Sequence, residues 1–463
     1  MNSLLNKIVE YKRKELRRKK KEFPLNRFKK KLKKSKKNFK KAISGKNKEI
    51  NFIAELKKAS PSSGIICRNF NLKKIAKTYN KYAQAVSVLT DKKFFKGSLS
   101  AIKEFSKYSD LPVLRKDFII DEYDVFESRY LGADAILLIA SILDTKHISQ
   151  FIEKAKKLGM DAVVEVNNKR ELNKVLNTSA EIILINNRNL NSFKINLNTT
   201  KKIIKEIPKK KRKKITVISA SGINKRKDVK EFSGKTDALL VGTAFMESDN
   251  IETTFRMLCG LPLVKICGIT NQTDAGNAIK AGASFLGFNF YRKSPRYMKP
   301  KNAAKIIKTV PSGIQSVGVF VNQEKSEVKK IKRICKLDLL QFHGKESPKY
   351  CAEFKNENII KTIRVKNKNS LKLLRKFNTK FKLLDSFDEN FYGGTGKIFD
   401  HSFTGKLNHN IFLAGGLNSK NVCRAIKTVN PFAVDVCSGV EKFPGKKDFV
   451  KIKQFVEAVK NVR

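Results

Sequence analysis

The chain has 463 residues, more than the roughly 250–300 residues at which a single hydrophobic core stops growing, so two domains are expected. Hydrophobic residues make up 41% of it, which is enough to bury two cores and excludes a disordered protein. The formal net charge of +57 would suit a polyanion, but because the lysines are spread along the whole chain we expect no specific nucleic-acid partner.

Residues 1–48 are the most basic part of the chain, with 21 Lys or Arg and three acidic residues. Apolar residues recur there at helical spacings, for example at Leu4, Ile8, Leu32 and Phe39. The pattern predicts basic amphipathic helices that pack on the following domain with their lysines in water.

Short apolar runs then alternate with polar stretches of helical periodicity, which is the pattern of βα units and a parallel sheet. The first half contains eight such runs, at 50–55, 84–90, 111–114, 134–139, 161–165, 182–186, 215–219 and 238–241. The second half contains eight more, at 263–267, 284–289, 316–320, 338–342, 358–363, 382–385, 411–414 and 432–436. Neither half has a G-x-G-x-x-G after its first strand. The predicted fold is therefore α/β, two tandem (β/α)8 barrels with extra N-terminal helices, over domains 1–258 and 262–463.

Polar side chains stand at the C-terminal ends of several predicted strands of the first half, where barrels of this kind carry their catalytic groups. They are Glu55, Lys57, Lys116, Glu165, Asn186 and Arg188. Any single one would suit a surface ion pair, but their convergence on one rim favours an active site. Ser221, Gly222 and Gly242 follow strands seven and eight, where small residues let backbone N–H groups approach a phosphate.

The segments IAELKKASPSSG, VSVLTDKKFFKGS, PVLRKDFIID, ADAILLIASIL, INNRNL and SASGI occur in this order. On these motifs, residues from about 1 to 258 resemble indole-3-glycerol-phosphate synthase. The resemblance implies that Lys116 is the general acid and Glu165 the general base, and that the polar site is completed by Lys57, Glu55, Asn186 and Arg188. It implies further substrate or phosphate contacts from Ser60, Ser221, Gly222 and Gly242.

Three positions depart from that family's pattern. Ala220 stands where the family has a carboxylate, Cys67 where an arginine is usual, and Asn189 where the family has an aspartate. Losing a supporting carboxylate costs on the order of a few kcal/mol of transition-state stabilisation unless neighbouring groups compensate. A weakened synthase therefore stays open as an alternative.

The second half carries its own set of polar residues at strand ends and in βα loops. They are Cys267, Arg296, His343, Asp385 and Asp435, followed by the phosphate-loop candidates Gly415, Gly416 and Ser438. A lone cysteine at a strand end is more often an inert buried thiol, unless its surroundings favour the thiolate.

The motifs KICGIT, SPRY, VGVF, LQFHG, LLDS, GGTGKIFD, FLAGGL and VDVCSGVE make residues 262–463 similar to phosphoribosylanthranilate isomerase. The resemblance implies that Cys267 is the general base and Asp385 the general acid, that Arg296 and Asp435 position the substrate, and that the phosphate lies near Gly415, Gly416 and Ser438. A thiolate at Cys267 would be favoured by Arg296 and a phosphate loop. Cys437 occupies a position that is usually Ser.

Together the two resemblances imply a bifunctional enzyme of tryptophan biosynthesis that acts on small sugar phosphates, the isomerase product being the synthase substrate. A basic nucleic-acid-binding or scaffold protein on a retired pair of barrels is the alternative from another class. A retired site should have lost its acids and bases, whereas Lys57, Lys116, Glu165, Cys267 and Asp385 all remain.

The remaining expectations concern cofactors, location and assembly. Seven cysteines without a C-x-x-C pair and four histidines without ligand spacing predict free thiols and no metal or cofactor. No run of 18 apolar residues occurs and the first 20 residues lack the apolar core of a secretory signal, which predicts a cytoplasmic protein without a membrane partner. We expect a monomer.

Overall fold

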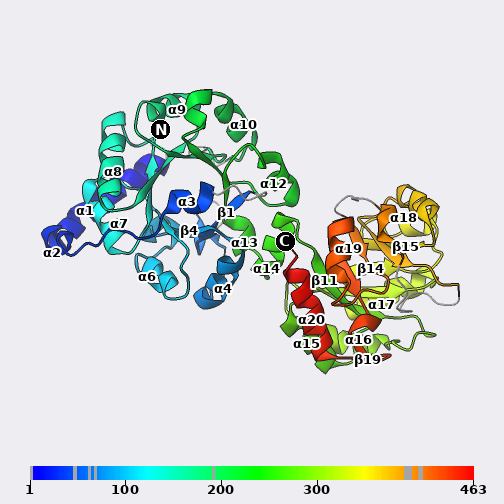
Figure 1. The fold of residues 1–463 in the computed structure, drawn as a ribbon. Helices are drawn as coiled ribbons and strands as arrows, with labels where there is room; N and C mark the ends of the chain where they lie inside the picture. The colour runs from blue at the N-terminus through cyan, green and yellow to red at the C-terminus, as the bar shows by residue number, and fades with distance from the viewer. Residues whose placement is uncertain are drawn as a thin grey trace. The chain divides into compact units, whose positions relative to one another are not determined.

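The computed structural model describes residues 4–44, 50–60, 64–66, 70–189, 192, 194–389, 399–404 and 410–462. The chain divides into two compact units, Met1–Cys259 and Gly260–Arg463. Each unit contains a closed barrel of eight parallel strands surrounded by helices (Figure 1). The predicted pair of (β/α)8 barrels is confirmed.

The first barrel is formed by strands that each overlap one of the predicted apolar runs. They are β1 (Asn51–Leu56), β4 (Ala85–Leu89), β5 (Val113–Lys116), β6 (Ala135–Ile139), β7 (Asp161–Val166), β8 (Ile182–Asn186), β9 (Thr216–Ala220) and β10 (Ala238–Val241). Each strand pairs with its sequence neighbour, and β10 pairs with β1 to close the ring. Strands buried on both faces need continuous apolar sequence, which is why the runs predicted them well.

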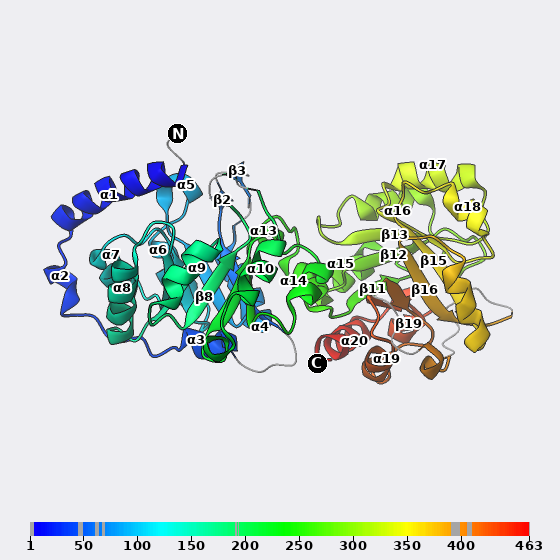
Figure 2. The same ribbon diagram turned by 90° about the horizontal axis from the view of Figure 1, so that it is seen from above.

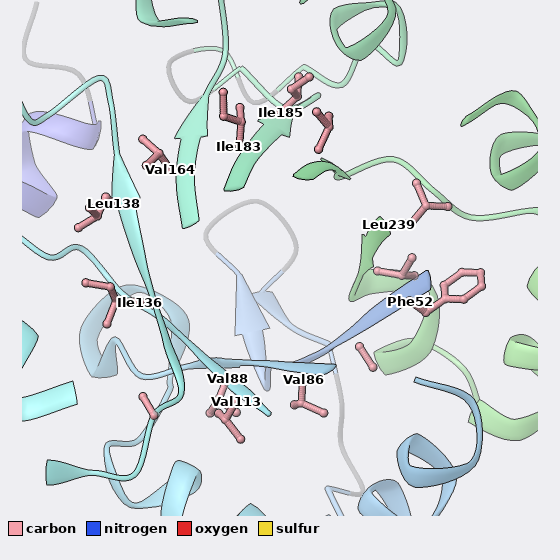
Figure 3. Packing of buried hydrophobic residues seen from close by; sticks show 14 of the residues in the cluster. Phe52, Val86, Val88, Val113, Ile136, Leu138, Val164, Ile183, Ile185 and Leu239 are labelled. Atoms are coloured by element: carbon pink, nitrogen blue, oxygen red, sulfur yellow. The ribbon is translucent and has the colours of Figure 1, made fainter. Parts of the chain in front are cut away.

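Successive side chains of each strand enter two different cores. One set, including Ile53, Leu114 and Leu184, fills the inside of the barrel. The alternate set points outward and packs against the helices, as Figure 3 shows for residues such as Phe52 and Ile136. This alternation follows from the two-residue period of a strand.

Helices connect the strands on the outside of the first barrel. They are α4 (Leu72–Tyr82), α5 (Lys92–Phe95), α6 (Ser100–Ser106), α7 (Glu122–Tyr130), α8 (Thr145–Lys157), α9 (Lys169–Leu176), α10 (Asn198–Lys205), α11 (Lys209–Arg212), α12 (Arg226–Phe232), α13 (Thr243–Met246) and α14 (Ile251–Cys259). A short hairpin of β2 (Ala59–Ser60) and β3 (Gly64–Ile65) follows β1.

The predicted extra N-terminal helices are α1 (Leu4–Glu22), α2 (Asn26–Lys29) and α3 (Phe39–Ser44). In Figure 2, α1 and α3 lie at opposite ends of the first barrel. Phe39 and Ile43 of α3 are fully buried in the inner core, so α3 closes the N-terminal end of the barrel.

Lys12 fixes α1 at the other end of the barrel. Its Nζ lies 2.9 Å from Oδ1 of Asp117 and 3.1 Å from Oδ2 of Asp91. Burial would raise the pKa of Asp117, but Arg115 and Lys12 outweigh burial and hold that pKa well below its usual range. The carboxylate is therefore ionised and joins α1 to the loop after β5, directly beside Lys116.

Replacing Arg115 with leucine is expected to destabilise the first barrel by about 3 kcal/mol, because it leaves buried carboxylates without their main counter-charge. Nη2 of Arg115 lies 2.9 Å from Glu127 and 3.1 Å from Asp117, and the residue is only 2% exposed. The matched control is Arg18→Leu, since the Arg18–Glu22 pair is exposed and such pairs contribute less than about 1 kcal/mol. Urea unfolding followed by pulse proteolysis measures both, and equal effects of the two substitutions would contradict the expectation.

The second barrel has the same order of parallel strands. They are β11 (Leu263–Cys267), β12 (Phe285–Asn289), β13 (Gln315–Phe320), β14 (Leu339–Phe342), β15 (Ile359–Val365), β16 (Phe381–Ser386), β17 (Ile411–Leu413) and β18 (Ala433–Val436). β18 pairs with β11 to close the ring. Its interior is filled mainly by large side chains such as Phe285, Leu339 and Phe412.

The connections of the second barrel include both α-helices and short 3-10 helices. They are α15 (Gln272–Ala281), α16 (Pro300–Ile307), α17 (Lys325–Cys335), α18 (Pro348–Ala352), η1 (Lys368–Arg375), η2 (His401–Thr404), α19 (Val422–Val429), η3 (Ser438–Val440) and α20 (Phe449–Lys460), with a hairpin of β19 (Glu441–Phe443) and β20 (Lys446–Lys447). Within the described ranges, no helix of either unit is long and apolar enough to cross a membrane.

Candidate active sites

A cavity of about 150 Å³ opens where the strands of the first barrel end. Its lining includes every predicted site residue of this barrel except Ser60, namely Glu55, Lys57, Lys116, Glu165, Asn186, Arg188, Ser221, Gly222 and Gly242. The side chain of Ser60 lies outside the described part of the chain. The structure therefore brings together residues from β1, β5, β7, β8 and the loops after β9 and β10.

Glu55 holds the two lysines of this cavity. Its Oε2 lies 2.9 Å from Nζ of Lys57, and its Oε1 lies 3.8 Å from Nζ of Lys116. Burial would raise the pKa of Glu55, but Lys57, Lys116 and Arg188 outweigh burial and lower it. Glu55 is thus a fixed anion that orients two ammonium groups, and Lys57 also donates to Oγ1 of Thr243 at 2.9 Å.

Glu165 has the opposite electrostatic character. Burial raises its pKa, and the nearby Lys116 offsets that only in part. Nδ2 of Asn186 donates to Oε1 of Glu165 at 3.0 Å, while Oδ1 of Asn186 accepts from the Ser221 hydroxyl at 2.9 Å. One lysine therefore lies between a carboxylate kept ionised and a carboxylate that binds a proton more readily, an arrangement suited to acid–base chemistry.

Two glycines at the rim are required by close packing. A Cβ on Gly242 would lie 2.0 Å from Oε2 of Glu55, and one on Gly222 would lie 2.5 Å from Cγ2 of Ile195. Gly222 also has a φ of +83° and follows Ser221 with a φ of +70°. Gly242 thus makes room for the carboxylate that holds the lysines, a reason that the sequence did not reveal.

Sequence reasoning missed other residues that line this cavity, chiefly Thr243 and Phe95. Phe95 belongs to a segment quoted for its resemblance, and its ring lies 6.2 Å from that of Phe118. Of the three departures, Ala220 is 3% exposed and lines the cavity, whereas Asn189 is exposed. Cys67 lies outside the described residues.

The second barrel has a smaller cavity, of about 80 Å³, at the C-terminal ends of its strands. Its lining includes all the predicted residues of this barrel, Cys267, Arg296, His343, Asp385, Gly415, Gly416, Asp435 and Ser438. Two groups that the sequence did not single out, Gln341 and Asn289, line it as well.

A chain of hydrogen bonds orients Asp385. Nε2 of Gln341 lies 2.9 Å from Nδ1 of His343, and Nε2 of His343 lies 3.1 Å from Oδ2 of Asp385. Because the Gln341 amide nitrogen can only donate, Nδ1 accepts, and the ring proton sits on Nε2 facing Asp385. The backbone N–H of Ser386 donates to Oδ1 of Asp385 at 2.9 Å.

Asp435 offers the cavity a free acceptor. Its Oδ2 lies 2.7 Å from Nζ of Lys265, which is fully buried. Burial raises the pKa of Asp435 to about 7 despite that lysine. No described group hydrogen-bonds to Oδ1 of Asp435 or to Oε1 of Gln341, so both oxygens are available to hydroxyl or N–H groups of a substrate.

A second thiol and a glutamate belong to the surroundings of Cys267 and Arg296. Arg296 donates to both carboxylate oxygens of Glu441, at 3.0 and 2.7 Å. A hydrogen bond with Cys437 and burial raise the pKa of Cys267. The same hydrogen bond, together with Lys447 and Arg296, lowers the pKa of Cys437 to about 6. Lys265 counteracts the rise at Cys267, so each thiol of the pair has a basic neighbour.

Comparison with known proteins gives one family for each barrel. Residues 5–258 match the family model described as indole-3-glycerol phosphate synthase, and residues 264–458 match the model described as N-(5'phosphoribosyl)anthranilate (PRA) isomerase. The chain is 38% identical over 467 residues to the tryptophan biosynthesis protein TrpCF of Buchnera aphidicola subsp. Diuraphis noxia, covering 99% of each protein. The chain belongs to the TrpCF family. It is a bifunctional enzyme of tryptophan biosynthesis, with a synthase and an isomerase barrel.

A second full-length relative and a solved structure of one barrel are similar to the chain as well. The TrpCF protein of Vibrio cholerae is 35% identical over 465 residues, which covers 100% of this chain and 97% of that protein. A crystal structure of phosphoribosyl anthranilate isomerase from Thermotoga maritima is 38% identical, with a TM-score of 0.40 over 43% of this chain and 99% of that one. Among the residues that the structure describes, no group of three or more His, Cys, Asp or Glu is placed to hold a metal ion.

Proposed function

We propose that residues 262–463 convert N-(5-phosphoribosyl)anthranilate to 1-(o-carboxyphenylamino)-1-deoxyribulose 5-phosphate, and that residues 1–258 close this product to indole-3-glycerol phosphate with loss of CO2 and water. One observation carries the proposal. The groups proposed as acid and base of the synthase line a single cavity of the first barrel, and those proposed for the isomerase line a single cavity of the second barrel. The chain is proposed to work as a cytoplasmic monomer.

In the synthase site, Lys116 is the proposed general acid. Ring closure requires a proton at the ketone oxygen while the aromatic carbon attacks, and a positioned ammonium group supplies it. Glu55 holds both Lys57 and Lys116 at the cavity wall. The later loss of water needs a base, and Glu165, which is raised in pKa by burial and oriented by Asn186, suits that role.

In the isomerase site, Asp385 is the proposed general acid and Cys267 the general base. Protonation of the furanose oxygen opens the sugar ring to an iminium, and removal of the C2′ proton then gives the enolamine. His343 fixes the direction of the Asp385 carboxyl group. The free acceptor oxygens of Asp435 and Gln341 suit substrate hydroxyl or N–H groups, and Gly415, Gly416 and Ser438 provide backbone N–H groups for the phosphate.

A synthase of reduced rate is the second candidate, because Ala220 places a methyl group at the cavity wall where the family has a carboxylate. The test feeds N-(5-phosphoribosyl)anthranilate to the full chain and follows both the isomerised intermediate and indole-3-glycerol phosphate. Accumulation of intermediate that Ala220→Glu relieves would favour the second candidate. Absence of both products would overturn the proposal.

The synthase kcat/KM is expected to rise with pH through an acidic limb that belongs to Glu165. Because burial raises the pKa of Glu165, the midpoint of that limb should lie above the ordinary value of 4.5. A base is active when deprotonated, so activity increases as pH passes upward through this pKa. Glu165→Gln should remove the limb and leave the isomerase profile unchanged, and a limb that persists in this variant would assign it to another group.

A further inference from the structure

Two cysteines face each other in the isomerase cavity. The first and last strands of the second barrel pair in the register Ile266 with Val436; Cys267 is the next and last residue of β11, and Cys437 directly follows β18. Neighbouring strands lie about 4.7–4.9 Å apart, which is within the usual Cα separation of about 4.4–6.8 Å for a disulfide. The side chains two positions earlier on each strand, Lys265 and Asp435, meet at 2.7 Å, so the two thiols lie on that same face of the sheet.

Glycines make room for both sulfurs. A Cβ on Gly287 would lie 2.6 Å from Sγ of Cys267, and a Cβ on Gly268 would lie 3.0 Å from Sγ of Cys437. Both cysteines are only partly buried and both line the cavity. A small solute that enters the cavity can therefore reach either sulfur.

Two basic groups lie close to Cys437. Nζ of Lys447 lies 3.7 Å from Sγ of Cys437, and the Arg296 guanidinium also lowers its pKa. The reactive form of a cysteine is its thiolate, and a thiol with a pKa near ambient pH reacts fastest. A thiolate beside a resolving thiol is the arrangement found in redox-sensitive sites.

We propose that Cys267 and Cys437 form an oxidative modification site, in which hydrogen peroxide converts the two thiols into a reversible disulfide that stops the isomerase. The functional consequence, though not the bond itself, rests on the proposed role of Cys267 as general base. The described lining of the synthase cavity contains no cysteine. Oxidation should therefore separate the two activities of one chain.

The chemistry balances with peroxide as the only co-reactant. The Cys437 thiolate attacks one peroxide oxygen, so that an S–O bond forms, the O–O bond breaks, and the leaving hydroxide takes up a proton as water. The Cys267 sulfur then attacks the sulfenic sulfur, the S–S bond forms, and the second oxygen leaves as water with the Cys267 proton. Two electrons pass from the sulfurs to the peroxide.

The test exposes the full-length enzyme to hydrogen peroxide and measures each activity on its own substrate. Isomerase kcat/KM should fall by roughly 100-fold, the loss expected when a general base is removed, and dithiothreitol should restore it. Synthase activity on the isomerised substrate should stay within about twofold. Peptide mapping of the oxidised protein should show Cys267 linked to Cys437.

Two variants and one reagent make the result specific. Cys437→Ser restores the usual residue, and its isomerase rate after peroxide treatment should stay close to the rate of the same variant before treatment. Cys423→Ser, on α19, should be inactivated by peroxide to the same extent as the unmodified enzyme. Phenylarsine oxide, which bridges two adjacent thiols, should inactivate the unmodified isomerase, and this arm does not depend on the folding of any variant.

The outcomes are distinguishable. Absence of the Cys267–Cys437 link at a peroxide dose that oxidises other cysteines would overturn the modification site. Equal reversible inactivation of Cys437→Ser would overturn it as well. A disulfide that forms while isomerisation continues would instead support the site and refute the catalytic role of Cys267.

Discussion

Lys116→Ala should abolish indole-ring formation while isomerisation continues at its original rate. Lys116 is one of two ammonium groups that Glu55 holds at the cavity wall. It also lies close enough to Glu165 to offset part of the rise that burial causes in the pKa of Glu165. Removing a positioned proton donor costs about 10²- to 10⁴-fold, which corresponds to roughly 3–5 kcal/mol of barrier. The assay follows indole-3-glycerol phosphate from the isomerised substrate.

Comparison variants separate chemistry from charge and folding. Lys154→Ala removes a half-buried lysine of α8 that pairs with Glu122, and it should change neither activity. Lys57→Ala removes the other partner of Glu55 and tests how far the dehydration depends on it. The isomerase of each variant serves as an internal measure of intact protein. Ring closure above about a tenth of the original rate in Lys116→Ala would refute its assignment as the general acid.

Much of the molecule could be predicted because the relevant information is local in the chain. A run such as 134–139 is apolar over its whole length since a barrel strand is buried on both faces, and β6 (Ala135–Ile139) coincides with it. The catalytic candidates were found for a related reason. A polar residue at the end of such a run, or just beyond it, lies at the barrel rim, and Glu55, Lys116 and Glu165 do line one cavity there.

The partners of those residues could not be predicted, because barrel closure joins segments that are distant in sequence. The hydrogen bond between Lys57 and Thr243 joins residues 186 positions apart in the sequence, and the one between Arg296 and Glu441 joins residues 145 positions apart. Nothing in the local pattern marks such pairs. Such pairs also change the chemistry of the site: Glu441 binds Arg296, and a second thiol, Cys437, raises the pKa of Cys267.

Cys267→Ala is expected to reduce isomerase kcat/KM by about 10²- to 10⁴-fold, the loss typical of a missing general base. The sulfur sits at the end of β11, on the wall that it shares with Asp385 and Asp435. The neighbouring Cys437 should not replace it, because Lys447 and Arg296 lower the pKa of Cys437 and so make it a weaker base. Fluorescence of the anthranilate substrate measures the loss directly.

Replacing each of the two thiols separately should have different effects on the isomerase. Cys437→Ala removes the partner whose hydrogen bond raises the pKa of Cys267, so Cys267 should ionise at lower pH and the isomerase should keep its activity with a pH profile shifted toward acid. If Cys437→Ala were the inactive variant and Cys267→Ala the active one, the base would have to be reassigned to Cys437. If both variants stayed active, proton removal from C2′ would belong to a group outside the thiol pair, and Asp435 is a carboxylate that lines the same cavity.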